Sequence, residues 1–161
     1  MKVLVVGGGG REHAVVDALS RSPQVSKIYC APGNAGIARQ AECVPVKDTD
    51  VEGLLSLARE KEIDLTVVGP EAALVAGIVD RFREEGLRIF GPTKAAARIE
   101  SSKEFAKDLM GRYGIPTAGY RAFTDYAAAM DYVASRPLPA ELKYDGLAAG
   151  KGVIIARTEA E

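Results

Sequence analysis

The sequence KVLVVGGGGREHAVV, residues 2–16, decides the fold class of this 161-residue chain. Its first part, Lys2–Val6, is rich in β-branched residues and predicts a short buried strand. Four glycines follow, and apolar residues then recur at helical spacing through residues 11–21. A strand, a glycine-rich turn and a helix in this order are typical of the first unit of a parallel α/β sheet.

The same alternation of strand and helix continues for about ninety residues. It predicts a parallel sheet with helices on both faces and right-handed crossovers. Ligands of such sheets bind beyond the carboxyl ends of the strands, where this sequence places four turns rich in glycine and proline. The further strands are predicted at residues 26–31, 42–46, 64–68 and 88–90, the further helices at 50–61 and 72–85, and the turns at 7–10, 32–34, 69–71 and 91–92.

The pattern changes after Pro92. We expect one α/β domain over residues 1–100 and an incomplete second domain over residues 101–161. Two of the second domain's strands, at 120–123 and 140–143, are expected to lack partners, which would leave their edges exposed. The elements predicted in this domain are helices at residues 101–112 and 125–135 and strands at 120–123, 140–143 and 153–156.

The composition argues against several functional classes. The chain has 21 basic and 22 acidic residues and no run of Lys or Arg, so bulk electrostatics does not favour nucleic-acid binding. No stretch approaches the roughly 20 apolar residues of a membrane-spanning helix, and we expect a cytoplasmic protein. Cys30 and Cys43 have no metal-type spacing and are expected to be free thiols.

The first glycine turn favours a monophosphate over a dinucleotide. The dinucleotide fingerprint requires a third glycine, but counting from Gly7 reaches Glu12 and counting from Gly8 reaches His13. The acidic ribose ligand expected after the second strand is also missing. Backbone N–H groups of the turn, together with Arg11, could hold one phosphate, although a tight turn without a ligand is the alternative. We interpret His13, the only histidine, as a structural residue.

Charged residues at two other turns are further candidates. Glu71 follows a strand end and could bind an amine or a ribose hydroxyl, or it could simply complement a helix dipole. The loop of residues 146–152 holds three glycines, two alanines and Lys151, which favours a flap over a polyphosphate rather than a flexible hairpin. Lys143 would point into the same space. Lys103 is a third candidate cation, although by itself it would be read as a solvated helix residue.

These stretches resemble the glycinamide ribonucleotide synthetase family, also called phosphoribosylamine–glycine ligases, of the ATP-grasp superfamily. They occur in the family's order and cover the whole chain. The resemblance implies a Rossmann-like pre-ATP-grasp sheet followed by a partial ATP-grasp domain. The matching stretches are Gly7–Ala14, Pro32–Gly36, Gly69–Glu71 with Leu74 and Gly77, Ser102–Lys103 with Phe105, Tyr113–Ala118 and Asp145–Val153.

The resemblance also implies a reaction, in which ATP drives the ligation of glycine to 5-phosphoribosylamine through glycyl phosphate. Mg²⁺ would assist, with its ligands outside these 161 residues, so the chain alone is not expected to turn over. The implied substrate residues are Gly8, Gly9, Gly10, Arg11, Asn34 and Glu71, and the implied ATP residues are Lys103, Lys143, Ala148, Ala149, Gly150, Lys151, Gly152 and Val153.

Two residues depart from the family's pattern, namely Glu141 in a strand that is usually apolar and Tyr144 where a small residue is usual. An edge position of that strand would accommodate Glu141. Other functional readings remain open at this stage. They are another ATP-grasp carboxylate–amine ligase, or a non-catalytic module that binds a sugar phosphate or a nucleotide. The sequence does not indicate the oligomeric state.

Overall fold

The computed structural model describes residues 1–148 and 151–158. The chain forms two compact units, Met1–Ala97 and Arg98–Glu161, and each is described by itself. Within the described residues, none of the helices has the length and apolar character that crossing a membrane requires.

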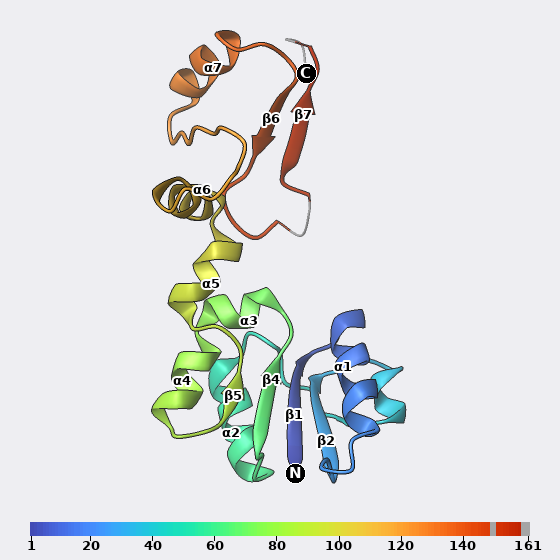
Figure 1. The fold of residues 1–161 in the computed structure, drawn as a ribbon. Coiled ribbons are helices and arrows are strands. Elements are labelled where there is room, and N and C mark those ends of the chain that lie inside the picture. Colours follow the sequence, from blue (N-terminus) through green and yellow to red (C-terminus); the bar gives the residue numbers. More distant parts are fainter. Residues whose placement is uncertain (149–150, 159–161) are drawn as a thin grey trace. The chain divides into compact units, whose positions relative to one another are not determined.

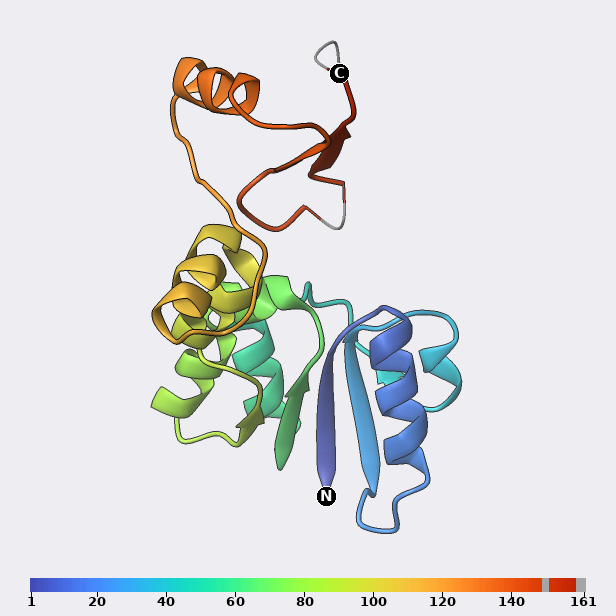
Figure 2. The same ribbon diagram turned by 45° about the horizontal axis from the view of Figure 1, so that its top comes forward.

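The first unit is built on a five-stranded parallel sheet. Its strand order is β3-β2-β1-β4-β5, so β1 lies at the centre and the chain reverses its direction of travel across the sheet between β1 and β4. β1, β2 and β4 lie side by side in both views (Figures 1 and 2). The parallel sheet predicted from the sequence is confirmed. The strands are β1 (Lys2–Gly7), β2 (Lys27–Pro32), β3 (Glu42–Cys43), β4 (Leu65–Val68) and β5 (Ile89–Phe90).

Helices cover both faces of this sheet, as predicted. Because successive side chains of a strand point to opposite faces, β1 contributes to two separate cores. Val3 and Val5 pack with Val16 of α1 and Ile37 of η1, whereas Leu4 and Val6 pack with the helices on the other face. The helical elements are α1 (Gly10–Ser20), the 3₁₀ turn η1 (Ile37–Arg39), α2 (Val51–Glu60), α3 (Glu71–Ala76) and α4 (Ile78–Glu84).

The single helix predicted over residues 72–85 is wrong, because the structure has two helices there. Gly77 separates α3 from α4 and has a φ of +95°, a left-handed conformation that side chains disfavour. The apolar pattern continues through this position, so periodicity alone could not reveal the break. The strand predicted over 42–46 is also shorter, since only Glu42–Cys43 pairs with β2.

The second unit contains helices and one hairpin. β6 pairs with β7 in antiparallel register, from Ala140 opposite Ala156 to Lys143 opposite Val153. The expectation that residues 140–143 lack a partner strand is therefore wrong. The elements are α5 (Lys94–Ser101), which begins in the first unit, α6 (Lys103–Arg112), α7 (Tyr126–Ala134), β6 (Ala140–Lys143) and β7 (Val153–Ala156).

Residues 94–123 differ from the sequence prediction in two respects. Residues 120–123 form no strand, because no described strand lies beside them, and the Phe123 ring packs instead on Tyr132 at 5.2 Å between centroids. Residues 94–101 form α5, a helix that was not predicted. Glu141 is exposed on β6, which agrees with the open position expected for this residue.

Candidate functional site

The glycine turn after β1 requires glycine because other backbones approach it closely. Gly7 has a φ of +121°, and a Cβ on Gly8 would lie 2.6 Å from the carbonyl oxygen of Gly33. The chain then enters α1, with Gly9 as the N-cap residue. Gly9 and Gly10 are exposed. The first N–H groups of a helix have no partner within the helix, so this turn presents donors to an anion.

Glu12, which was not among the predicted site residues, supports this turn from its buried side. Its side chain is 5% exposed and its Oε2 accepts the backbone N–H of Gly9 at 2.6 Å. It fills the space against Gly7 and Gly69, where any Cβ would lie within 3 Å of its atoms. The glutamate three residues after the N-cap was the available signal, because this is the spacing of a capping box. Glu12 thus joins the ends of β1 and β4.

Asn34 lies at the same edge, although its side chain mainly contacts the protein. Its Nδ2 donates to the carbonyl of Gly8 at 2.8 Å, and its Oδ1 accepts the N–H groups of Gly36 at 2.8 Å and Ile37 at 2.9 Å. The side chain therefore ties the turn after β2 to the turn after β1. His13 packs against Gly36, where a Cβ would lie 2.7 Å from its Cε1.

Arg11 and Glu71 form an ion pair across the ends of β1 and β4. The Nη2 of Arg11 lies 2.9 Å from the Oε1 of Glu71, and the Arg11 side chain is 73% exposed. The pKa of Glu71 is lowered, first by a hydrogen bond from its own backbone N–H and then by Arg11. Glu71 is also the first residue of α3. It therefore stays ionised and can accept a hydrogen bond from an amine or a hydroxyl.

These contacts bring three of the predicted turns together at one edge of the sheet. The turns after β1 and β4 flank the point where the strand order changes direction, which is the position where open α/β sheets bind ligands. Gly91, from the fourth turn, packs against Leu74 and Val79 instead. Cys30 lies beneath the first turn, where its Sγ contacts the carbonyl of Gly7, and burial raises the pKa of its thiol to about 12, so the thiol is protonated at neutral pH. Both cysteines are free, as expected.

In the second unit, Lys103 contacts the loop that was predicted to cover a polyphosphate. Its Nζ donates to the carbonyl of Gly146 at 2.8 Å, and its backbone N–H donates to Asp145. Asp145 was not among the predicted site residues either. Lys143 lies 3.3 Å from Glu141, two residues earlier on the same face of β6.

The remaining loop residues border an open depression of about 310 Å³ formed by the hairpin. Lys143, Lys151 and Gly152 line it together, beside Tyr144. Tyr144 packs on two glycines of the loop, Gly146 and Gly152, so the unusual aromatic residue supports the turn. Ala148 contacts Gly152, and Val153 begins β7. Ala149 and Gly150 lie outside the described residues.

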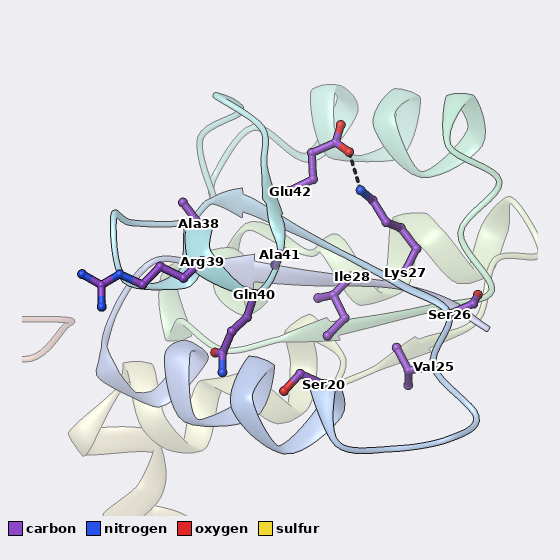
Figure 3. Close-up of a pocket in the computed structure, with 10 residues that line it drawn as sticks. All are labelled: Ser20, Val25, Ser26, Lys27, Ile28, Ala38, Arg39, Gln40, Ala41 and Glu42. Carbon is purple, nitrogen blue, oxygen red and sulfur yellow. Dashed lines mark ion pairs between the residues drawn. The ribbon is translucent and has the colours of Figure 1, made fainter.

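A larger depression, of about 400 Å³, lies elsewhere on the first unit (Figure 3). It is bordered by the end of α1, the start of β2 and η1, with the ion pair of Lys27 and Glu42 at one side. None of the predicted site residues lines it. We place the candidate site at the carboxyl edge, because backbone N–H groups on an exposed turn recognise an anion without a deep cavity.

The described residues contain no group of three or more His, Cys, Asp or Glu that could hold a metal ion.

Known proteins match the chain along its whole length. The model of the phosphoribosylglycinamide synthetase N domain matches residues 1–100, and that of the ATP-grasp (A) domain of the same enzyme matches residues 101–161. A phosphoribosylamine–glycine ligase from Caldanaerobacter subterraneus subsp. tengcongensis is 56% identical over 157 residues, which cover 98% of this chain and 38% of that protein. The chain thus spans well under half the length of this relative.

Solved structures agree with the sequence comparison. A phosphoribosylamine–glycine ligase from Thermotoga maritima is 33% identical with a TM-score of 0.75, covering 99% of this chain and 37% of that one. An N5-carboxyaminoimidazole ribonucleotide synthetase from the same organism has the same TM-score at 20% identity, and the match covers 99% of this chain and 42% of that protein. At this identity, the likeness supports the fold alone. The matching domains, in order and without a gap, establish that the chain belongs to the phosphoribosylglycinamide synthetase family.

Proposed function

We propose that this chain contributes the sugar-phosphate site and part of the ATP site of a ligase that joins glycine to 5-phosphoribosylamine. In this reaction, the carboxylate of glycine attacks the γ-phosphorus of ATP, which gives glycyl phosphate and ADP. The ribosylamine nitrogen then attacks the acyl carbon, phosphate leaves, and the nitrogen loses a proton. The products are glycinamide ribonucleotide, ADP and phosphate, as in de novo purine synthesis.

The observation that carries the proposal is the group of donors and charges at the carboxyl edge of the first unit. In the turn of Gly8, Gly9 and Gly10, Glu12 already accepts the N–H of Gly9, so the N–H groups of Gly8 and Gly10 are the ones offered to the 5-phosphate. Arg11 adds a positive charge. Glu71 offers an ionised carboxylate for the amine or a ribose hydroxyl. Asn34 supports the turn through its contact with Gly8. A single phosphate suits this short turn better than a dinucleotide.

For the nucleotide we propose Lys103, Lys143 and Lys151 as the cations that neutralise the phosphates, with Ala148–Val153 as the covering loop. Phosphoryl transfer depends mainly on positioning and charge neutralisation, which lysines and a closing loop supply. Mg²⁺ would supply further charge neutralisation for the phosphates, and its ligands are assigned to no residue of this chain. The compartment that we propose is the cytoplasm, where free thiols such as those of Cys30 and Cys43 stay reduced.

Isothermal titration with ribose 5-phosphate tests the site. We expect saturable binding to the 161-residue chain and a loss of about tenfold or more in affinity for Arg11→Ala, since a hydrogen bond to a charged group contributes about 1.5–3 kcal/mol. Arg21→Ala is the matched control. Arg21 is also exposed, at 68%, but it lies at the other end of α1 and pairs with Asp17.

Two results would contradict the proposal. One is an equal loss of affinity for Arg21→Ala and Arg11→Ala, which would mean that net charge and not the turn decides binding. The other is NAD⁺ binding as tight as that of ribose 5-phosphate. We also expect no glycine-dependent formation of ADP by the chain itself, because no metal ligand is assigned to it, and a coupled ADP assay would detect such formation.

A further inference from the structure

A cluster of hydrogen bonds within the second unit joins the start of the glycine-rich loop to the first turn of α6. The Oδ1 of Asp145 accepts the backbone N–H groups of Lys103 at 2.5 Å and of Glu104 at 3.2 Å. Its Oδ2 accepts the hydroxyl of Ser102 at 3.0 Å. The Oγ of Ser102 in turn accepts the N–H of Phe105 at 3.1 Å. These contacts satisfy three of the four N–H groups that the start of a helix leaves unpaired, and the fourth, that of Ser102, donates to the carbonyl of Arg98 at 2.9 Å.

A side chain of the helix also donates to the loop. The ammonium group of Lys103 donates to the carbonyl of Gly146 at 2.8 Å, directly after Asp145. Burial raises the pKa of Asp145, but hydrogen bonds from Glu104, Ser102 and Lys103 outweigh it, so that the pKa is lowered overall. Asp145 is therefore ionised at neutral pH, and its hydrogen bonds are charge-assisted.

Asp145 is not an ordinary helix cap. Ser102 already caps α6 from the position directly before it, whereas Asp145 lies 43 residues later in the chain than Ser102. The other aspartate that caps a helix in this unit, Asp125, is a local cap that accepts the N–H of Ala128. The additional, long-range cap therefore fixes the point where the loop leaves β6.

We propose that Asp145 is a positioning residue that fastens the glycine-rich loop to α6 and thereby holds the ammonium group of Lys103 beside that loop. This arrangement limits how a phosphate can contact Lys103. Because a carboxylate already occupies the N-terminus of α6, a phosphate cannot bind these N–H groups and would meet Lys103 only through its ammonium group. The part played by nucleotide rests on the proposed function, whereas the fastening itself does not.

Hydrogen–deuterium exchange of the 161-residue chain tests the fastening without nucleotide. In Asp145→Ala we expect the N–H groups of Lys103 and Glu104 to exchange about tenfold faster or more, as for the loss of charge-assisted hydrogen bonds. Trypsin should also cleave after Lys151 severalfold faster. Asp145→Asn should restore most of both effects, since its amide oxygen accepts the same N–H groups and its amide nitrogen can donate to Ser102, although these hydrogen bonds are no longer charge-assisted.

Asp125→Ala is the matched control, because it removes a helix cap of the same unit that does not touch the loop. It should accelerate exchange at Ala128 and leave Lys103, Glu104 and cleavage at Lys151 unchanged. The proposal is overturned if Asp145→Ala leaves the exchange at Lys103 and Glu104 unchanged. It is equally overturned if Asp125→Ala accelerates cleavage at Lys151 as much. Should Asp145→Ala unfold the whole unit, Asp145→Asn decides: we expect a modest acceleration confined to Lys103 and Glu104, and an equal acceleration at Ala128 contradicts the proposal.

Titration with ATP separates this inference from the proposed function. If the chain binds ATP, Asp145→Ala should weaken binding several times more than Asp125→Ala, and equal losses would contradict the positioning role. If the wild-type protein binds no ATP while exchange at Lys103 still depends on Asp145, the proposed role in nucleotide binding is wrong. The role of Asp145 in holding the loop against α6 is then still supported.

Discussion

At the scale of single residues, Glu12 has the largest structural consequence in the turn after β1. It is one of only two polar or charged residues buried among the described residues, and its carboxylate holds the N–H of Gly9. A buried acceptor that is removed leaves its donor without a partner, which costs more than a surface contact. The identity of this residue therefore controls the conformation of the turn to which we assign the phosphate.

We predict that Glu12→Ala lowers the free energy of unfolding by about 1–3 kcal/mol, because the Gly9 N–H loses its acceptor and a cavity remains. Glu12→Gln should cost less, since its amide oxygen can still accept. Urea denaturation measures both. Glu52→Ala is the control, because Glu52 is also an acid in a first helical turn but is 67% exposed and should change stability by about 0–1 kcal/mol. A loss for Glu12→Ala no larger than this would contradict the assigned role.

Glu71 provides a prediction about pH. Its pKa is lowered in the folded protein, so its contribution to stability is present above its ordinary pKa of 4.5 and disappears as the pH falls through the folded value. The difference in free energy of unfolding between wild type and Glu71→Gln should therefore be largest above about pH 5 and shrink in more acidic solution. Denaturation curves at several pH values measure it. A difference that grows on acidification would contradict the lowered pKa.

At the scale of elements, Gly77 decides that α3 and α4 are two helices. Gly111, in the last turn of α6, is a contrasting glycine, because it has a helical conformation and open space around the position of its missing Cβ. The two positions separate the effect of backbone conformation from that of space. At Gly77 the nearest atom to a Cβ is 3.4 Å away, in ordinary contact, so only the positive φ opposes a side chain.

We predict that Gly77→Ala lowers the free energy of unfolding by about 1–2 kcal/mol, the cost of a left-handed conformation for an L-residue. Gly111→Ala should raise it by about 0.4–1 kcal/mol through helix propensity and a less flexible unfolded chain. Chemical denaturation followed by circular dichroism compares them. Stabilisation by Gly77→Ala would indicate that α3 and α4 can merge into the single helix suggested by the apolar pattern.

At the scale of the whole molecule, the two units differ in how much apolar surface they bury. Both hydrophobic cores belong to residues 1–97, whereas among the described residues from 98 onward only Ala156 is buried. Apolar burial is the main favourable contribution to folding, so the first unit should be much the more stable. Exposed apolar side chains on the hairpin, such as Ile154 at 61%, belong to the less stable unit.

We predict two transitions in urea, with the second unit unfolding first. Tyrosine fluorescence separates them, because five of the six tyrosines lie beyond residue 97 and only Tyr29 lies before it. Fluorescence should change at a lower urea concentration than the main loss of circular dichroism. The isolated Met1–Ala97 unit should reproduce the later transition. Coincident transitions for both signals would show that the two units unfold together.

The sequence alone was sufficient for the class of the fold and the family. The β-branched run before four glycines, followed by a helical pattern, specified the parallel sheet because strand and helix periods are local properties of the chain. Residues 120–123 had a strand-like composition but lack a partner, and pairing depends on distant residues. The break at Gly77 depends on the conformation of one backbone position within a continuous apolar pattern. Neither could be read from periodicity.

The sequence also identified the turns that would supply a site, since glycines, Arg11 and Glu71 stand at strand ends. Only the tertiary structure decided which side chains hold those turns in place. Glu12 lies between Gly7 and Gly69, and Asp145 binds the start of a helix about forty residues before it. A carboxylate looks the same in a sequence whether it is solvated or buried against two backbones. Folding places the backbones of Gly7 and Gly69 against the carboxylate of Glu12, and this proximity determines the role of the residue.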